Sequence, residues 1–367
     1  MMTGRERFLT ALRNEKPDRL PCQVHNWMDS YLRTQLGGRD AYEAYEFFGM
    51  DPVIYVNPEL IYDPHDQEKW QEKFQLLDMD ADGNQWWQRT ITTPKGILTE
   101  KGAYNQYTGW ITEHIIKSKD DFELWNEFIP IPVKVDWSGV EQAKKRIGET
   151  GIVRGSVFGF GQGSPWQDFS SHLFDMEEAI FSAMDDPDWV HHVLSCLLEK
   201  KLNVIEKYGK VAWDVVETGG GAASSTVISP AMFDEFCIPY DRQQHEALHA
   251  AGATIVYHLC GGLMPMLERV VENGADGLET MTPPEMGGDC VLEEATKRVG
   301  DKLFFVGGFD QRGGFENGTP DDVRQMVHRL HDACPNGGYI ISPSDHFFEG
   351  RIENVRAFAD AVKECTY

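Results

Sequence analysis

The chain has 367 residues, of which 41% are hydrophobic and 25% are charged. These fractions are ordinary for a globular protein, and they exclude the intrinsically disordered, collagen-like and disulfide-scaffold classes. An excess of 59 Asp and Glu residues over 34 Lys and Arg residues gives a net charge of −25. Such an acidic surface repels phosphate backbones and anionic lipids, so we expect neither nucleic acid nor a membrane as a partner.

The seven cysteines are scattered along the chain and form no Cys-x-x-Cys pair. An odd number of isolated thiols is typical of a reducing compartment, where such thiols fill the core or bind ligands. The N-terminus has no apolar run of signal-peptide length, and no stretch approaches the ~20 apolar residues of a membrane span. We therefore expect a cytoplasmic protein.

The first elements have clear start and stop signals. Thr3 followed by Glu6 is a capping-box pattern, which predicts a helix at the N-terminus. That helix should end near Asn14, because Pro17 cannot continue it. Residues 20–25 (LPCQVH) then predict a short strand.

Residues 38–135 are less regular than the rest of the chain. Alternating apolar and polar residues at 89–93 and 110–114 predict antiparallel hairpins in this part. We interpret residues 60–135 as an inserted, β-rich, lid-like region of a single domain that spans residues 1–367.

From residue 137 onward, short β-branched apolar runs alternate with helical stretches that begin at signals such as Ser229-Pro230 and Thr319-Pro320. The runs predict strands at 152–158, 212–217, 254–258, 275–279, 303–306 and 339–342. This alternation is typical of βαβ units around a parallel sheet. The sequence therefore predicts an α/β fold, a (β/α)8 TIM barrel with an N-terminal β-rich insertion. An open doubly wound sheet is the alternative, but no GxGxxG motif follows the first strand.

Polar residues end five of the predicted strands, where a TIM barrel places its chemistry. They are Glu217, His258 with Cys260, Glu279, Asp310, and Asp345 with His346. His25 ends the first predicted strand and joins this rim by its position. Glu279 follows a run too apolar to hide an unpaired carboxylate, so it should face water, a partner or a metal.

The His258-x-Cys260 spacing is the most specific of these patterns. Residues two apart on a strand face the same side, so the imidazole and the thiol converge. Zn²⁺ accepts both nitrogen and sulfur, and a catalytic zinc needs three protein ligands and one open position. The further ligands could be Glu217, Glu279, Asp345 or His346. The alternative interpretation is a core cysteine beside a hydrogen-bonded histidine, and Asp345-His346 could equally be a solvated pair.

Several segments together form a recognisable set of motifs. They are RERFLTALR at 5–13, KPDRLP at 16–21, SPAMFDEFCIP at 229–239, HLCG at 258–261, GGYIISP at 337–343 and ENV at 353–355. In these motifs the chain resembles the uroporphyrinogen decarboxylase-like proteins over almost its whole length, most weakly at residues 60–135. The resemblance implies a (β/α)8 barrel with its site at the C-terminal mouth.

The motifs also separate two branches of that superfamily. Uroporphyrinogen decarboxylases carry an arginine-rich segment after the first strand to grip substrate carboxylates, whereas residues 24–30 here read VHNWMDS. The chain is more similar to the cobamide-dependent methyltransferases, which bind zinc through His-x-Cys and a distal cysteine. His258 and Cys260 match the first two ligands. The distal position lacks the cysteine, so the resemblance implies Asp345 or its neighbour His346 as the third ligand.

These observations lead to one preferred function and two alternatives. We expect a zinc-dependent methyltransferase, with the O-demethylase type favoured, that moves a methyl group between a methoxylated compound or thiol and a separate corrinoid protein. The expected metal ligands are His258, Cys260 and Asp345, and the candidate general acids are Glu217, Glu279 and His346. The alternatives are a metal-free decarboxylase of a tetrapyrrole or small acid, and a non-catalytic corrinoid-binding module. A homodimer is also considered.

Overall fold

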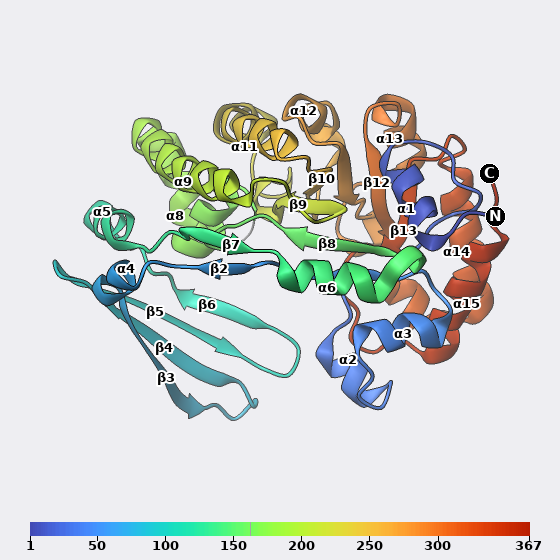
Figure 1. Cartoon of the computed structure of the whole chain (residues 1–367), viewed down its shortest axis with the longest axis horizontal. Helices are drawn as coiled ribbons and strands as arrows, with labels where there is room; N and C mark the ends of the chain where they lie inside the picture. The colour runs from blue at the N-terminus through green and yellow to red at the C-terminus, as the bar shows by residue number, and fades with distance from the viewer. Residues whose placement is uncertain (162) are drawn as a thin grey trace.

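The computed structural model describes residues 1–161 and 163–367. Seven parallel strands form its central sheet, in the order β1-β8-β9-β10-β11-β12-β13. Their bounds are β1 Val53–Tyr55, β8 Ile152–Ser156, β9 Val215–Gly219, β10 Ile255–His258, β11 Gly277–Thr280, β12 Phe304–Phe309 and β13 Tyr339–Pro343. Each strand from β9 onward lies beside the one that precedes it in the chain, so the sheet curls in one direction, as in a barrel (Figure 1).

The segment at residues 20–24 takes the place of the eighth strand. It forms a single parallel bridge, Cys22 to Ile341 of β13, with the Gln23 amide donating to the Ile341 carbonyl at 3.0 Å. The segment does not form a longer ladder, partly because Pro21 has no N–H to donate. The predicted (β/α)8 barrel is confirmed, with the strand predicted at 20–25 reduced to this bridge.

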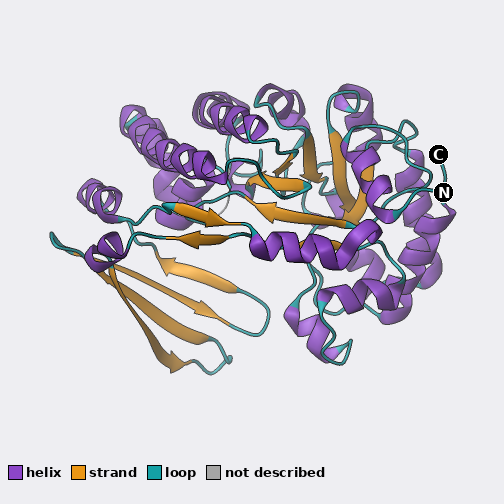
Figure 2. Cartoon of the chain, viewed as in Figure 1, coloured by secondary structure: helices purple, strands orange, loops and turns teal. Residues whose placement is uncertain are grey.

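Helices cover the outside of the sheet (Figure 2). Those of the barrel are α1 Gly4–Leu12, α2 Asp29–Thr34, α3 Ala41–Phe48, α6 Ser138–Ile147, α9 Pro187–Tyr208, α11 Ile238–Ala250, α12 Leu267–Glu272, α13 Leu292–Val299, α14 Pro320–Asp332 and α15 Ile352–Glu364. The other helices are α4 Pro64–Lys69, α5 Lys119–Phe128, α7 Pro165–Gln167, α8 Met176–Asp185 and α10 Pro230–Met232. The capping box at Thr3 and Glu6 is present, and Pro320 occupies the first turn of α14 behind its Thr319 cap, as predicted.

A separate antiparallel sheet projects from the barrel (Figure 1). Its strands are β3 Gln71–Met79, β4 Gln85–Thr92, β5 Ile97–Tyr104 and β6 Gly109–Glu113, in that order. The strands β2 Glu59–Ile61 and β7 Lys134–Asp136 pair where the chain leaves and re-enters the barrel. The predicted antiparallel hairpins are therefore confirmed. At the tip between β5 and β6, the Tyr107 ring packs against Phe348 of the loop after β13, with ring centroids 5.3 Å apart.

The core lies between the parallel sheet and its helices, and every residue of β10, β11, β12 and β13 is buried. Strands that are covered on both faces consist of continuous apolar residues, which explains why these strands could be located from the sequence. Of the helices in the described part of the chain, none combines the length and apolar character needed to cross a membrane.

Candidate active site at the barrel mouth

The polar residues of neighbouring strands meet at the C-terminal end of the sheet. His258 of β10 lies opposite Glu279 of β11, and Glu217 of β9 lies opposite Val256, two residues before His258. Because parallel strands end at the same edge, residues far apart in the sequence share one rim. The structure thus brings together three of the residues that the sequence singled out.

A buried arginine, Arg154 of β8, joins two of these carboxylates. Its Nη1 donates to Glu279 Oε2 at 2.7 Å, and its Nη2 donates to Glu217 Oε2 at 2.6 Å. The Arg154 side chain is only 1% exposed. Sequence reasoning missed this residue, although a lone arginine inside the apolar run at 152–158 was a usable signal, because a buried charge requires partners.

His258 continues the same network. Its Nδ1 lies 2.9 Å from Glu279 Oε1 and 3.6 Å from Glu217 Oε1. Burial opposes the charged imidazole, but hydrogen bonds with Cys260 and Glu279 and the two nearby carboxylates raise the pKa of His258 well above its usual value. The carboxylates of this network therefore favour a second positive charge beside Arg154, carried either by a proton on His258 or by a bound cation.

Glu279 is held in its ionised form by these partners. Burial alone would raise its pKa, but the Arg154 charge and the His258 hydrogen bond lower the pKa far below its ordinary value. A carboxylate that resists protonation makes a poor general acid. The contact of Glu279 Oε1 with His258 Nδ1 fixes the orientation of the His258 ring, and the proton-donor role considered from the sequence stays a prediction.

A second group gathers around His25. Ligand atoms of His25, Asp345 and His346 all lie within 4.8 Å of one another, and so do those of His25, His258 and Glu279. Burial lowers the pKa of His25 to about 4, so this imidazole is neutral at pH 7. Burial opposes ionisation of Asp345, but hydrogen bonds from His346 lower the Asp345 pKa to about 2.

Cys260 lies beside these groups rather than within them. Among the described residues, two groups of potential metal ligands have their ligand atoms within 4.8 Å of one another. Both groups contain His25, and neither contains Cys260. Its Sγ packs against the backbone of Gly221, where an added Cβ would lie 2.5 Å from the sulfur. The thiol still reaches His258 through a hydrogen bond.

Comparison with known proteins identifies the family of this barrel. Residues 110–365 match the model of the uroporphyrinogen decarboxylase (URO-D) family. The chain belongs to this family. None of the curated proteins matches the chain.

Solved structures place this URO-D family member among barrels of similar shape. It is similar to a methyltransferase from Methanosarcina mazei, with a TM-score of 0.67, 14% identity and 99% of each chain covered. A B12-independent methionine synthase from Shewanella sp. W3-18-1 matches with a TM-score of 0.46 and 10% identity, over 95% of this chain and 93% of that one. At 14% identity, the likeness to the Methanosarcina structure establishes the fold.

The donors at the mouth of this URO-D barrel fit a divalent metal ion. Imidazole nitrogens and carboxylate oxygens are zinc ligands, and a thiol lies next to them. Several buried hydroxyls of the described residues have no hydrogen-bond partner, and two of these, on Tyr55 and Ser344, lie near the donors of the mouth. Tyr55 ends β1 beside His25, at 6.4 Å between ring centroids, and Ser344 precedes Asp345. Buried polar atoms are rarely left unpaired, so these two are consistent with a site built for a further group.

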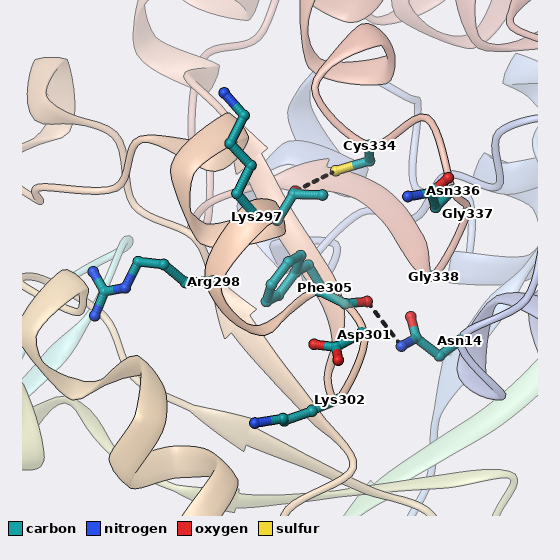
Figure 3. A pocket seen from close by; sticks show the side chains of 12 residues that line it. Asn14, Lys297, Arg298, Asp301, Lys302, Phe305, Cys334, Asn336, Gly337 and Gly338 are labelled. Carbon is teal, nitrogen blue, oxygen red and sulfur yellow. Dashed lines mark hydrogen bonds between the residues drawn. The ribbon is translucent and has the colours of Figure 1, made fainter.

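A cavity of about 500 Å³ lies at the opposite end of the barrel (Figure 3). It is lined by the residues that precede β12 and β13, including Lys302 and Gly338, and by Asn14, whose amide donates to the Gly300 carbonyl at 2.9 Å. The N-terminal face of a TIM barrel serves stability rather than catalysis. The candidate active site is therefore the C-terminal mouth.

Proposed function

We propose that this URO-D family member is a zinc-dependent methyltransferase that moves a methyl group between a small substrate and the corrinoid of a separate protein. The observation that carries the proposal is the chain of contacts Arg154–Glu279–His258 at the barrel mouth. Glu279 occupies Nδ1 of His258, which leaves Nε2 as the nitrogen for a metal. A carboxylate behind an imidazole is the usual outer partner of a metal-binding histidine.

The residues of the mouth have different roles in this proposal. His258 would hold the ion together with the donors around it, among which the sequence singled out Cys260 and Asp345. When bound, zinc supplies Lewis acidity to the heteroatom that loses or receives the methyl group. Arg154 and Glu279 keep the His258 ring in one orientation. Glu217 is the carboxyl group best placed to exchange a proton with substrate, because its side chain remains 17% exposed.

The favoured direction is demethylation of a methoxylated compound. The bond between the methyl carbon and the oxygen breaks, and its electron pair stays on the oxygen. Reduced cobalt(I) of the partner supplies the electron pair for the new cobalt–carbon bond, and the oxygen then takes up a proton. Transfer of the methyl group to the corrinoid of a second protein requires a barrel mouth that this protein can reach. A site at the rim of the sheet agrees with this requirement.

The charge pattern favours methyl transfer over decarboxylation of a multiply acidic substrate. A decarboxylase needs cations for the substrate carboxylates, but Arg154 is already bound to two carboxylates of the protein. A purely binding module would gain little from burying the charged groups Arg154 and Glu279 beside His258, because charged groups are costly to bury.

The test combines metal analysis with a methyl-transfer assay. We expect purified protein to contain about one equivalent of zinc and to convert cobalt(I) cobalamin to methylcobalamin with a methoxylated aromatic donor. His258→Ala should abolish both, whereas His65→Ala, a change at an exposed histidine of α4, should leave both unchanged. Zinc-independent release of CO₂ from an acid, without any corrinoid, would instead support the decarboxylase alternative.

A further inference from the structure

His25 is a buried histidine whose ring makes no hydrogen bond within the described part of the chain. The residue is only 8% exposed, and no described residue donates to or accepts from either of its ring nitrogens. A neutral imidazole carries one N–H donor and one nitrogen lone pair, and buried polar atoms of this kind are rarely left without a partner. The described residues therefore leave the bonding capacity of His25 unused.

The His25 ring lies at the right distance from His258 for both rings to share one metal ion. The two ring centroids are 5.5 Å apart, and ligand atoms of His25, His258 and Glu279 lie within 4.8 Å of one another. An imidazole nitrogen binds zinc at about 2.0–2.1 Å, which places the ring centroid about 3.2 Å from the ion. Two such rings at a tetrahedral angle have centroids about 5.2 Å apart, close to the observed spacing.

The carboxylate of this group, Glu279, is already engaged on both oxygens. Oε2 accepts a hydrogen bond from Arg154 Nη1 at 2.7 Å, and Oε1 accepts one from Arg154 Nη2 and lies 2.9 Å from His258 Nδ1. Because an arginine does not lose its charge in a protein, a cation bound directly to Glu279 would lie against a fixed positive charge. The free donors of the group are therefore the two imidazoles, with Glu279 as the outer partner of His258.

Asp345 and His346 belong to a different group. Their ligand atoms lie close to those of His25, but in the described chain no close group of potential ligands joins either of them to His258. Asp345 Oδ1 is instead 3.0 Å from His346 Nδ1, and the two side chains are 57% and 33% exposed. These two residues form a solvent-facing pair that does not reach an ion held by His258.

We infer that His25 is a ligand of the same metal ion as His258, in the place that the resemblance assigned to Asp345 or His346. The inference rests on the proposed function for the presence and the task of the ion. His25 follows the segment that bridges β13, whereas His258 ends β10. The ion therefore connects the irregular segment that completes the barrel with a strand on the far side of β11, β12 and β13 in the sheet order.

The first experiment measures zinc affinity and stoichiometry of the full-length protein, independently of activity. We expect His25→Ala and His25→Gln to bind zinc more than about a hundredfold more weakly, beyond the roughly 10–100-fold range typical of an outer partner. Asp345→Asn and His346→Ala should weaken binding by less than about tenfold. His65→Ala, at an exposed histidine, is the matched control and should bind zinc as wild type does. Circular dichroism and thermal melting establish that each variant is folded.

The second experiment tests contact between residue 25 and the ion directly. His25→Cys offers a thiolate, which also binds zinc, so this variant should recover affinity relative to His25→Ala. After cobalt(II) substitution, His25→Cys should gain a thiolate-to-cobalt charge-transfer band relative to wild type, and His346→Cys should gain none. A folded His25→Cys that binds cobalt without this added band would contradict a ligand at this position.

The outcomes separate the inference from the proposed function. Full zinc binding in folded His25→Gln, with loss of zinc in His258→Ala, would overturn the role of His25 and leave the proposed function standing. Zinc that is kept in His258→Ala but lost in both His25→Ala and His346→Ala would place the ion in the other group, against both proposals. A wild-type protein that binds no zinc would also overturn both.

Discussion

Arg154 determines the charge balance of the mouth, because it is buried against two carboxylates, those of Glu279 and Glu217. Replacing it with a neutral residue leaves Glu279 and Glu217 without their cation. Breaking a buried ion pair by removing one partner typically costs about 3–5 kcal/mol. The same change frees the Glu279 side chain to move, and the His258 ring then loses its fixed orientation.

We therefore expect Arg154→Gln to lower the free energy of unfolding by about 3 kcal/mol or more and to weaken zinc binding by about 10–100-fold. Urea denaturation and zinc titration measure the two effects. Arg13→Gln is the matched control, because the Arg13 side chain is 57% exposed in its ion pair with Glu15. The control should change stability by less than about 1 kcal/mol. Equal stabilities of both variants would contradict the assigned role of Arg154.

Asp241 is a second buried acid, and it predicts a pH dependence of stability. Its Oδ2 accepts a hydrogen bond from the Tyr257 hydroxyl at 2.7 Å, and burial raises the Asp241 pKa from 3.8 to about 7. Between these two pH values the folded protein keeps a proton that the unfolded chain releases. Raising the pH through this window therefore favours the unfolded chain, and the stabilisation present at low pH is lost.

Asp241→Asn should remove this slope, since an amide does not titrate. The stability of wild type relative to the variant should fall between pH 4 and pH 8, by up to about 4 kcal/mol for a shift of this size. Urea denaturation of both proteins at several pH values gives this difference and cancels the contributions of the other titrating groups. A difference that stays constant or rises with pH would show that Asp241 is ionised in the folded protein.

At the scale of elements, the sequence could locate most strands but could not define how they close. Strands β8 to β13 are apolar runs covered on both faces, so composition and spacing reveal them. The segment at 20–24 is different, because its bonding depends on β13, more than 300 residues away, and on the missing N–H of Pro21. Pairing between segments so far apart in the chain leaves no local pattern in the amino-acid sequence.

The same reasoning applies to the site. Glu217, His258 and Glu279 could be grouped in advance, because neighbouring parallel strands end at one edge. The pairing of Arg154 with Glu279 could not be predicted in this way, because Glu279 lies 125 positions further along the chain. The position of His25 between two other rings likewise depends on loop geometry that spacing rules do not describe.

The hairpin between β5 and β6 has a contact that links it to the site loop. Tyr107 packs against Phe348, two residues after His346. An aromatic pair of this type contributes about 0.5–1.5 kcal/mol. We expect Tyr107→Ala to leave the melting temperature within about 3 °C of wild type and to raise the KM for the methoxylated donor several-fold, because the site loop loses a support.

The control for this prediction is Tyr104→Ala, on the same hairpin. Tyr104 is exposed to a similar degree, 42% against 39% for Tyr107. Steady-state kinetics should distinguish the two variants by KM, and limited proteolysis should cut the loop at 345–350 faster in Tyr107→Ala alone. Identical kinetics and cleavage in both variants would show that the hairpin has no role in substrate access.

For the whole molecule, the last residues of the chain hold in place the N-terminal segment that leads to the site. Arg19 and Thr366 form an antiparallel bridge, and the Leu20 amide donates to the Cys365 carbonyl at 2.8 Å. Figure 1 shows both termini on the same side of the molecule. The segment that is fixed in this way leads directly to His25, so the placement of His25 at the barrel mouth depends on the last residues of the chain.

Removing residues 365–367 should therefore affect both stability and metal binding. The truncation deletes backbone hydrogen bonds worth about 1 kcal/mol each and the buried side chain of Cys365. We expect the melting temperature to fall by several degrees and zinc affinity to decrease, as His25 is held less firmly. Thr366→Ala keeps the backbone bonds and should resemble wild type in both measurements. If the truncated protein melts lower but binds zinc as tightly as wild type, then His25 is positioned independently of this closure.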